Sequence, residues 1–147
     1  MKVGALVLVY ALAIGVPSAL AWPGRPANSP PKPPNPGAPP PAWIETQAGS
    51  TWLGFSSYCW TTGRTGTCAD AIAPKCGQAG VPDIPVAGDE TVRAHLGYTP
   101  IGASVDNAKA KLDGRIVTWR VTERGPFLLF TKGKGRDASY VGCAVSR

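Results

Sequence analysis

Two cysteines, Cys59 and Cys68, enclose a short segment rich in glycine and threonine, and this pair constrains the fold more than any other feature of the chain. The glycines of the segment accept the positive φ that tight β-hairpin turns need. Cysteines that face each other across a short hairpin lie near the separation that a disulfide requires. We therefore predict a disulfide-linked hairpin with its turn over residues 61–67, in which Tyr58 and Trp60 flank the first cysteine.

The other two cysteines, Cys76 and Cys143, lie in the same part of the chain. An even number of cysteines behind an export signal indicates two disulfides, for which three connectivities exist. Closure across the hairpin favours Cys59–Cys68, which leaves Cys76–Cys143. The alternative is a zinc site, but the chain has no C-x-x-C pair and only one histidine.

The amino end has the pattern of a secretory signal peptide over residues 1–21. One lysine precedes an apolar run, and the run ends in Ala19-Leu20-Ala21. The alternative is a retained membrane anchor, but the apolar run only just reaches the length of a spanning helix and Pro17 interrupts it. No cysteine follows at the position where a lipoprotein would be lipidated. The expected location is therefore outside the cytoplasm, secreted or in the cell envelope.

Residues 22–42 form a proline-rich linker between this signal and a domain over 43–147. Dense proline excludes the segment from helix interiors and sheet ladders and favours polyproline II. About 20 such residues span roughly 60 Å as a semi-rigid spacer. The segment is interpreted as a tether, as a ligand for a proline-binding module, or as a disordered leader.

Short β-rich segments separated by Gly and Pro follow one another through the domain, which is long enough for one core. They predict an all-β fold, a disulfide-linked antiparallel β-sandwich of the immunoglobulin-like kind. The expected strands cover residues 51–58, 81–86 (at an edge or in a loop), 90–96, 115–122, 127–131 and 138–145.

Two of these strands are expected to pair with each other, 115–122 with 127–131, across the turn at residues 123–126. Alternation within 115–122 places Trp119 on the buried face, between two valines. Only residues 107–112 have a briefly helical pattern.

The sequence Ser57-Tyr58-Cys59-Trp60, followed after a variable turn by Cys68-Ala69-Asp70, resembles a motif of small exported bacterial β-sandwich proteins, many of them lipoproteins. The segment Val86-Ala87-Gly88-Asp89-Glu90 and the carboxy-terminal Asp137-Ala138-Ser139-Tyr140 resemble the same proteins. That family has no established activity, so the resemblance implies a fold and a compartment. This chain differs in lacking a lipidation cysteine and in adding Cys76 and Cys143.

The sequence contains few candidate catalytic residues. His95 is the only imidazole, with Asp89 or Asp106 as a conceivable carboxylate partner, and no G-x-S-x-G nucleophile motif occurs. A copper centre would need two histidines and a free cysteine. We therefore expect no enzyme, with no catalytic, metal-binding or cofactor-binding residues and no cofactor.

Binding has better candidates. Tyr58, Trp60 and Arg64 lie on or beside the hairpin turn, and aromatic residues with arginine are typical of interaction hot spots. The alternative is that Trp60 packs in the core against the disulfide, as a tryptophan does in immunoglobulin-like sandwiches.

Charge adds a second group of candidates. The net charge of the chain is +6, and removing Lys2, Arg25 and Lys32 leaves 12 basic residues against nine acidic ones in the domain. Much of this excess lies in a glycine-spaced hairpin loop that carries Lys132, Lys134 and Arg136. Such a loop either meets anionic wall polymers and lipid headgroups or is a solvated turn.

Together these features predict a non-enzymatic binding or structural module of the cell envelope. The expected partner is an anionic envelope polymer or another envelope protein. Nucleic acid is not expected, and membrane contact is at most peripheral unless the signal is retained. The alternatives are a secreted inhibitor or effector that acts through the Cys59–Cys68 hairpin and, third, a small secreted hydrolase.

Overall fold

The computed structural model describes residues 24–71 and 73–147, so the signal predicted over residues 1–21 lies outside the described residues. The described part is all β, without a helix long and apolar enough to cross a membrane. The strands are β1 (Trp43–Thr46), β2 (Gly49–Trp52), β3 (Gly54–Thr62), β4 (Thr65–Ala69), β5 (Asp83–Val86), β6 (Glu90–His95), β7 (Gly102–Val105), β8 (Ala108–Lys109), β9 (Lys111–Asp113), β10 (Ile116–Val121), β11 (Gly125–Lys132) and β12 (Arg136–Ser146).

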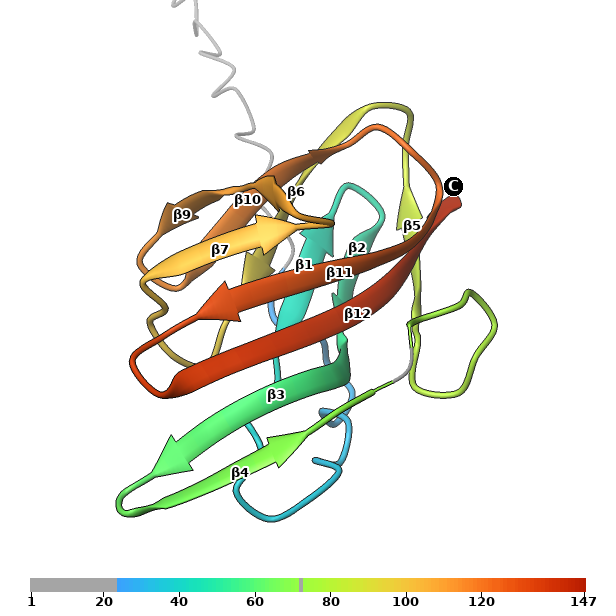
Figure 1. Ribbon diagram of the computed structural model, residues 1–147. Helices are drawn as coiled ribbons and strands as arrows, with labels where there is room; N and C mark the ends of the chain where they lie inside the picture. Colours follow the sequence, from blue (N-terminus) through green and yellow to red (C-terminus); the bar gives the residue numbers. More distant parts are fainter. Residues whose placement is uncertain (1–23, 72) are drawn as a thin grey trace, which may run out of the picture.

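These strands form two sheets that pack as a β-sandwich, which confirms the predicted fold class (Figure 1). The five-stranded sheet has the order β2-β1-β6-β10-β9. The seven-stranded sheet has the order β4-β3-β12-β11-β7-β8, and β5 pairs in parallel with the end of β12. The immunoglobulin-like topology stays a prediction.

The core lies between the sheets and comes from alternate residues of each strand. In β6, Val92 and Ala94 are fully buried while Thr91 is exposed, as the predicted alternation requires. The opposite sheet contributes Leu129 and Tyr140, which are also fully buried. Glu90, the first residue of β6, is buried, and its carboxylate accepts hydrogen bonds from the backbone N–H groups of residues 47 and 87.

The predicted pairing of residues 115–122 with 127–131 is wrong. β10 pairs with β6 and β9 in one sheet, whereas β11 pairs with β12 and β7 in the other. The connecting residues 122–124 carry the chain from sheet to sheet, and Arg124 holds this corner by donating to the carbonyl of Gly88 at 2.9 Å. Each strand therefore buries its apolar side against the other strand's sheet.

Trp119 is half-buried rather than buried. Its neighbours Val117 and Val121 are buried as predicted, and its ring lies 5.7 Å from that of Phe127 across the sandwich. Because β9 is short, the end of the sandwich near Trp119 is open, and the ring lines a hollow there.

Two further local expectations are corrected. The strand predicted over 51–58 is divided at Leu53, because β2 belongs to the five-stranded sheet and β3 to the seven-stranded one. The helical segment expected over 107–112 is instead the end of a hairpin and the strand β9. Asp106 and Asn107 both have positive φ, which a two-residue hairpin turn of type I′ needs and a helix does not allow.

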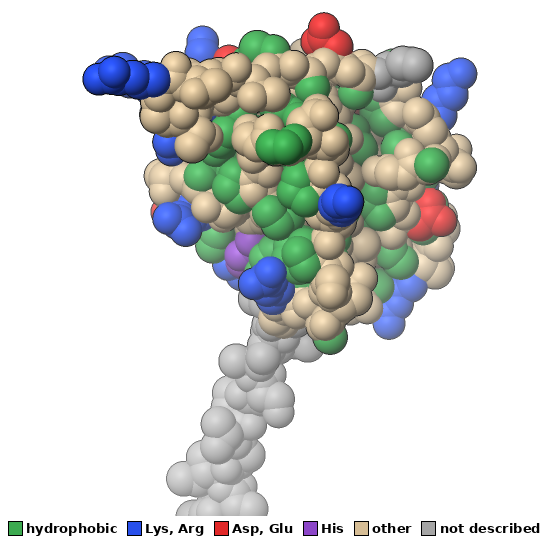
Figure 2. Space-filling model, turned by 90° about the horizontal axis from the view of Figure 1, so that it is seen from below, with side chains coloured by type: hydrophobic (Ala, Val, Ile, Leu, Met, Phe, Trp, Pro, Cys, Tyr) green, Lys and Arg blue, Asp and Glu red, His purple; other side chains and the backbone are tan. Residues whose placement is uncertain are grey.

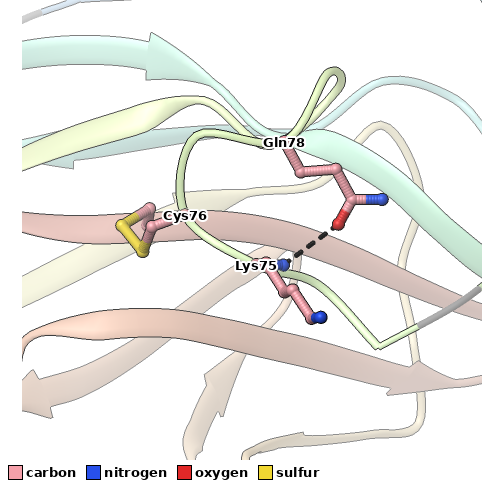
Figure 3. The surroundings of a disulfide bond; sticks show 4 residues. Lys75, Cys76 and Gln78 are labelled. Carbon is pink, nitrogen blue, oxygen red and sulfur yellow. Dashed lines mark hydrogen bonds between the residues drawn. A yellow bond between two sulfur atoms is a disulfide. The ribbon is translucent and has the colours of Figure 1, made fainter.

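Both predicted disulfides are present, Cys59–Cys68 and Cys76–Cys143, and the described residues include no free cysteine. Cys59 and Cys68 are directly opposite each other on β3 and β4. The second disulfide fastens the loop at Cys76 to β12, and the backbone N–H of Lys75 in this loop donates to the side chain of Gln78 at 3.1 Å (Figure 3).

The proline-rich segment contacts the domain from residue 25 onward. The indole N–H of Trp52 donates to the carbonyl of Asn28 at 2.9 Å, and the guanidinium of Arg25 lies 4.8 Å from the same ring. Pro39 is fully buried, and the hydroxyl of Tyr140 donates to the carbonyl of Pro40 at 2.8 Å. The segment that was expected to be a linker therefore forms part of the domain's surface and core over residues 25–42.

Candidate functional site

A groove of about 900 Å³ lies at one end of the sandwich, between strands of the seven-stranded sheet and the segments that flank β6 and β10 of the other sheet. Its lining comes from the tip of the β3–β4 hairpin, the segment that follows β6, the β11–β12 loop, the residue before β10 and the proline-rich segment. The lining residues are Pro40, Trp60, Thr61, Thr62, Gly63, Gly97, Tyr98, Thr99, Ile101, Arg115, Gly133, Lys134 and Arg136.

Two buried aromatic side chains, Trp60 and Tyr98, form the inner wall of the groove. Their ring centroids lie 4.6 Å apart in an edge-to-face arrangement. The hydroxyl of Tyr98 donates to the hydroxyl of Thr131, which in turn donates to the carbonyl of Ala138 at 3.0 Å. Burial raises the pKa of Tyr98, the hydrogen bond to Thr131 opposes this shift, and Asp137 adds to it. The wall is therefore fixed in position and uncharged at neutral pH.

Arg136 lies directly over this wall. It is opposite Trp60 in the pairing of β12 with β3, and its guanidinium carbon lies 5.5 Å from the centre of the indole ring. Its Nε donates to the carbonyl of Thr61 at 3.1 Å. These contacts hold the arginine beside the groove while its side chain stays exposed.

Two more cations complete the basic lining. Arg115 comes from the residue before β10, is exposed, and donates from Nε to the hydroxyl of Thr99 at 3.4 Å. Lys134 lies at the tip of the β11–β12 loop. This loop is tied to β3, because Thr61 donates its backbone N–H to the carbonyl of Gly135 at 2.9 Å.

The groove has one sign of charge. Among the residues that the structure describes, three cations and no Asp or Glu line it. The nearby Asp137 has another role, since its carboxylate accepts the backbone N–H of Gly133 at 3.1 Å and so shapes the loop. Figure 2 shows the underside of the molecule, where hydrophobic side chains gather over the middle and most charged side chains around the edge are Lys or Arg. A groove that is lined by cations and by no described acidic residue attracts anions.

The candidate residues from the sequence divide between this groove and other places. Trp60, Lys134 and Arg136 meet in it. Lys132 does not line it, because side-chain alternation along β11 places it on the face opposite that of the buried Thr131. Tyr58 is buried, and its hydroxyl accepts a hydrogen bond from the side-chain amide of Asn35 at 3.1 Å.

Trp60 is buried, but not against the hairpin disulfide. Its neighbour Cys59 is exposed on the opposite face of β3, as is Cys68 on β4. The tryptophan packs instead on Tyr98 and Arg136. Arg64 is exposed at the hairpin turn, outside the groove lining.

Sequence reasoning missed most of the lining, including Tyr98, Ile101 and Arg115. Ile101 is 73% exposed, which makes it the most exposed large hydrophobic side chain of the described residues. Its neighbours Pro100 and Gly102 form an ordinary turn sequence, so no local pattern marks it. These residues reach the groove only through the pairing of strands that are distant in the sequence.

His95 has a different carboxylate partner from those considered. Its Nε2 lies 3.1 Å from Oε2 of buried Glu45, although neither atom has a hydrogen bond to another described residue. The ring stacks on that of Trp43 at 3.9 Å. Asp89 pairs with an arginine on β10, and Asp106 accepts the backbone N–H of residue 128.

No cluster of three or more metal-ligating side chains occurs within residues 24–71 and 73–147. Comparison of the chain with models of protein families, with curated proteins and with solved structures finds no match.

Proposed function

We propose that the protein is a non-enzymatic binding module of the cell envelope that holds an anionic polymer in the groove. The observation that carries this proposal is the lining itself, in which Arg115, Lys134 and Arg136 converge without a described acidic residue. The aromatic wall supports it, because a fixed, uncharged surface excludes water from one side of a bound chain and strengthens the charge contacts on the other.

The proposed location in the cell envelope rests on the amino-terminal sequence and on the disulfides. A signal-peptide pattern precedes the domain, and the two disulfides fit an oxidising compartment outside the cytoplasm. Envelope polymers in that compartment carry phosphate or carboxylate groups in repeating units. Such a polymer offers several negative charges in a row to the three cations of the groove.

Titration with two soluble polyanions tests the proposal, with polyphosphate as the phosphate-bearing probe and polygalacturonate as the carboxylate-bearing one. Each surface cation near an anionic partner contributes about 1 kcal/mol at moderate salt. The double variant Arg115→Gln/Lys134→Gln should therefore weaken binding by about tenfold or more. Neutralising these exposed residues leaves the Arg136–Trp60 contact in place.

The matched control is Lys75→Gln/Lys132→Gln, which removes two exposed cations outside the groove. It should bind like the wild type, and added salt should weaken both proteins alike. Absence of binding to both polyanions at low salt would refute the proposal. So would an equal loss of affinity in the two double variants, because the attraction would then come from net charge alone.

A further inference from the structure

The strand β4 (Thr65–Ala69) lies at the rim of the seven-stranded sheet (Figure 1). It pairs only with β3, and no residue of 24–71 or 73–147 pairs with its other edge. Gly66 and Cys68 are both exposed. Gly37 of the proline-rich segment lies beside the side chain of Thr67, which shares the face of Trp60, but the backbone groups on the outer edge of β4 have no described hydrogen-bond partner.

The hairpin geometry fixes which groups point outward. Thr62 faces Thr65 across a two-residue turn that begins with Gly63, and such a turn closes with a hydrogen-bonded pair. Hydrogen-bonded and non-hydrogen-bonded pairs alternate along an antiparallel ladder. Cys68, three residues farther along, is then in a non-hydrogen-bonded pair with Cys59. The Cα separation of 4.1 Å in that pair agrees with this assignment.

It follows that Gly66 and Cys68 direct their N–H and C=O groups away from β3, toward the free edge. Natural edge strands usually carry a lysine, a proline or a bulge that blocks further pairing. β4 has none of these, and its register with β3 is unbroken over all five residues. The disulfide at Cys68 additionally fastens this strand to its neighbour β3.

We propose that the free edge of β4 pairs with the same edge of a second copy of this chain, antiparallel, about a two-fold axis at Thr67. In that register Gly66 of one copy faces Cys68 of the other, so that the outward groups of both strands meet in hydrogen-bonded pairs. The same register brings Arg64 of each copy opposite Asp70 of the other.

Charge complementarity selects this occupant. Arg64 and Asp70 stand at equal distances on either side of Thr67, carry opposite charges and are exposed. Neither is in a hydrogen bond or ion pair with another described residue. Two-fold pairing creates two Arg64–Asp70 pairs, one at each end of the joined strands. A parallel arrangement would instead place Arg64 beside Arg64 and Asp70 beside Asp70.

Charge reversal tests the pairing by sedimentation velocity of the oxidised protein over a range of concentrations. Wild type should show a concentration-dependent dimer. Arg64→Asp alone and Asp70→Arg alone should each raise the dissociation constant by at least about tenfold, because like charges then face each other. Both positions are exposed, so the melting temperatures of the variants should match that of the wild type.

Mixing the two variants provides the decisive measurement. In a mixed dimer, two aspartates of one copy face two arginines of the other, so an equimolar mixture should dimerise although each variant alone does not. A wild-type protein that stays monomeric at all concentrations would overturn the proposal and leave the edge to an extended segment of another protein. Unimpaired dimers of the single variants, or a mixture that stays monomeric, would also overturn it.

Discussion

Raising the pH above 10 is expected to destabilise the fold, because burial raises the pKa of two phenols, those of Tyr98 and Tyr140. Burial raises the pKa of Tyr140 well above its ordinary value, and Tyr98 adds to this effect. Burial also raises the pKa of Tyr98, against the opposing hydrogen bond to Thr131. In the unfolded chain both phenols ionise near pH 10. Above that pH the unfolded chain holds fewer protons than the folded protein, so stability is complete below pH 10 and decreases as the pH rises.

The size of the effect follows from linkage. A phenol that stays protonated in the folded protein lowers the free energy of unfolding by about 1.4 kcal/mol per pH unit once the unfolded form ionises. Tyr140 is fully buried and should therefore cost about 1.4 kcal/mol by pH 11. Tyr98 should add a smaller loss in the same direction, because its hydrogen bond offsets part of the burial.

The variant Tyr140→Phe separates this effect from general alkaline damage. At pH 8 it should be less stable by about 1 kcal/mol, because the hydrogen bond to the carbonyl of Pro40 is lost. At pH 11 it should be as stable as the wild type or more so, since phenylalanine has no proton to lose. Urea unfolding followed by tryptophan fluorescence between pH 8 and 11 measures both values. Parallel pH curves for the two proteins would refute the reasoning.

Two further predictions concern the disulfides and the core. Mild reduction followed by alkylation should label Cys59 and Cys68 before Cys143, because both of these cysteines are exposed whereas Cys143 is 1% exposed; simultaneous labelling of all three would contradict this. Gly142→Ala should lower stability by about 1–3 kcal/mol, since the added Cβ would lie 2.7 Å from the ring of Phe127. The control Gly102→Ala has open space around it and should change stability by no more than about 0.5 kcal/mol.

The features that could be predicted from the sequence are local ones. The hairpin disulfide follows from two cysteines close in the chain, and β6 follows from strict alternation around Val92. Alternation reports which side of a strand is buried, but not which sheet the strand joins. For this reason the partner of β10 was predicted wrongly, although its buried residues Val117 and Val121 were identified.

The groove illustrates the same limit. Lys134 and Arg136 were recognised together because they are close in the sequence, whereas Arg115 comes from the residue before β10 and Tyr98 from the segment after β6. Charge counting also grouped Lys132 with its neighbours, although alternation along β11 separates it from them. A site assembled from five segments that are distant in the sequence has no fixed residue spacing, so no sequence motif identifies it.

The groove and the edge of β4 have a common consequence if both proposals hold. The tip of the hairpin at Gly63 lines the groove, and in the proposed dimer the two tips point in opposite directions, about 20 Å apart along the joined strands. A long polymer would engage both grooves at once, whereas a short oligomer would fill only one. Arg64→Asp should therefore weaken binding of long polygalacturonate by tenfold or more and leave binding of its trimer unchanged. Equal weakening of both would instead assign Arg64 to the groove itself, and the dimer would then have no part in binding.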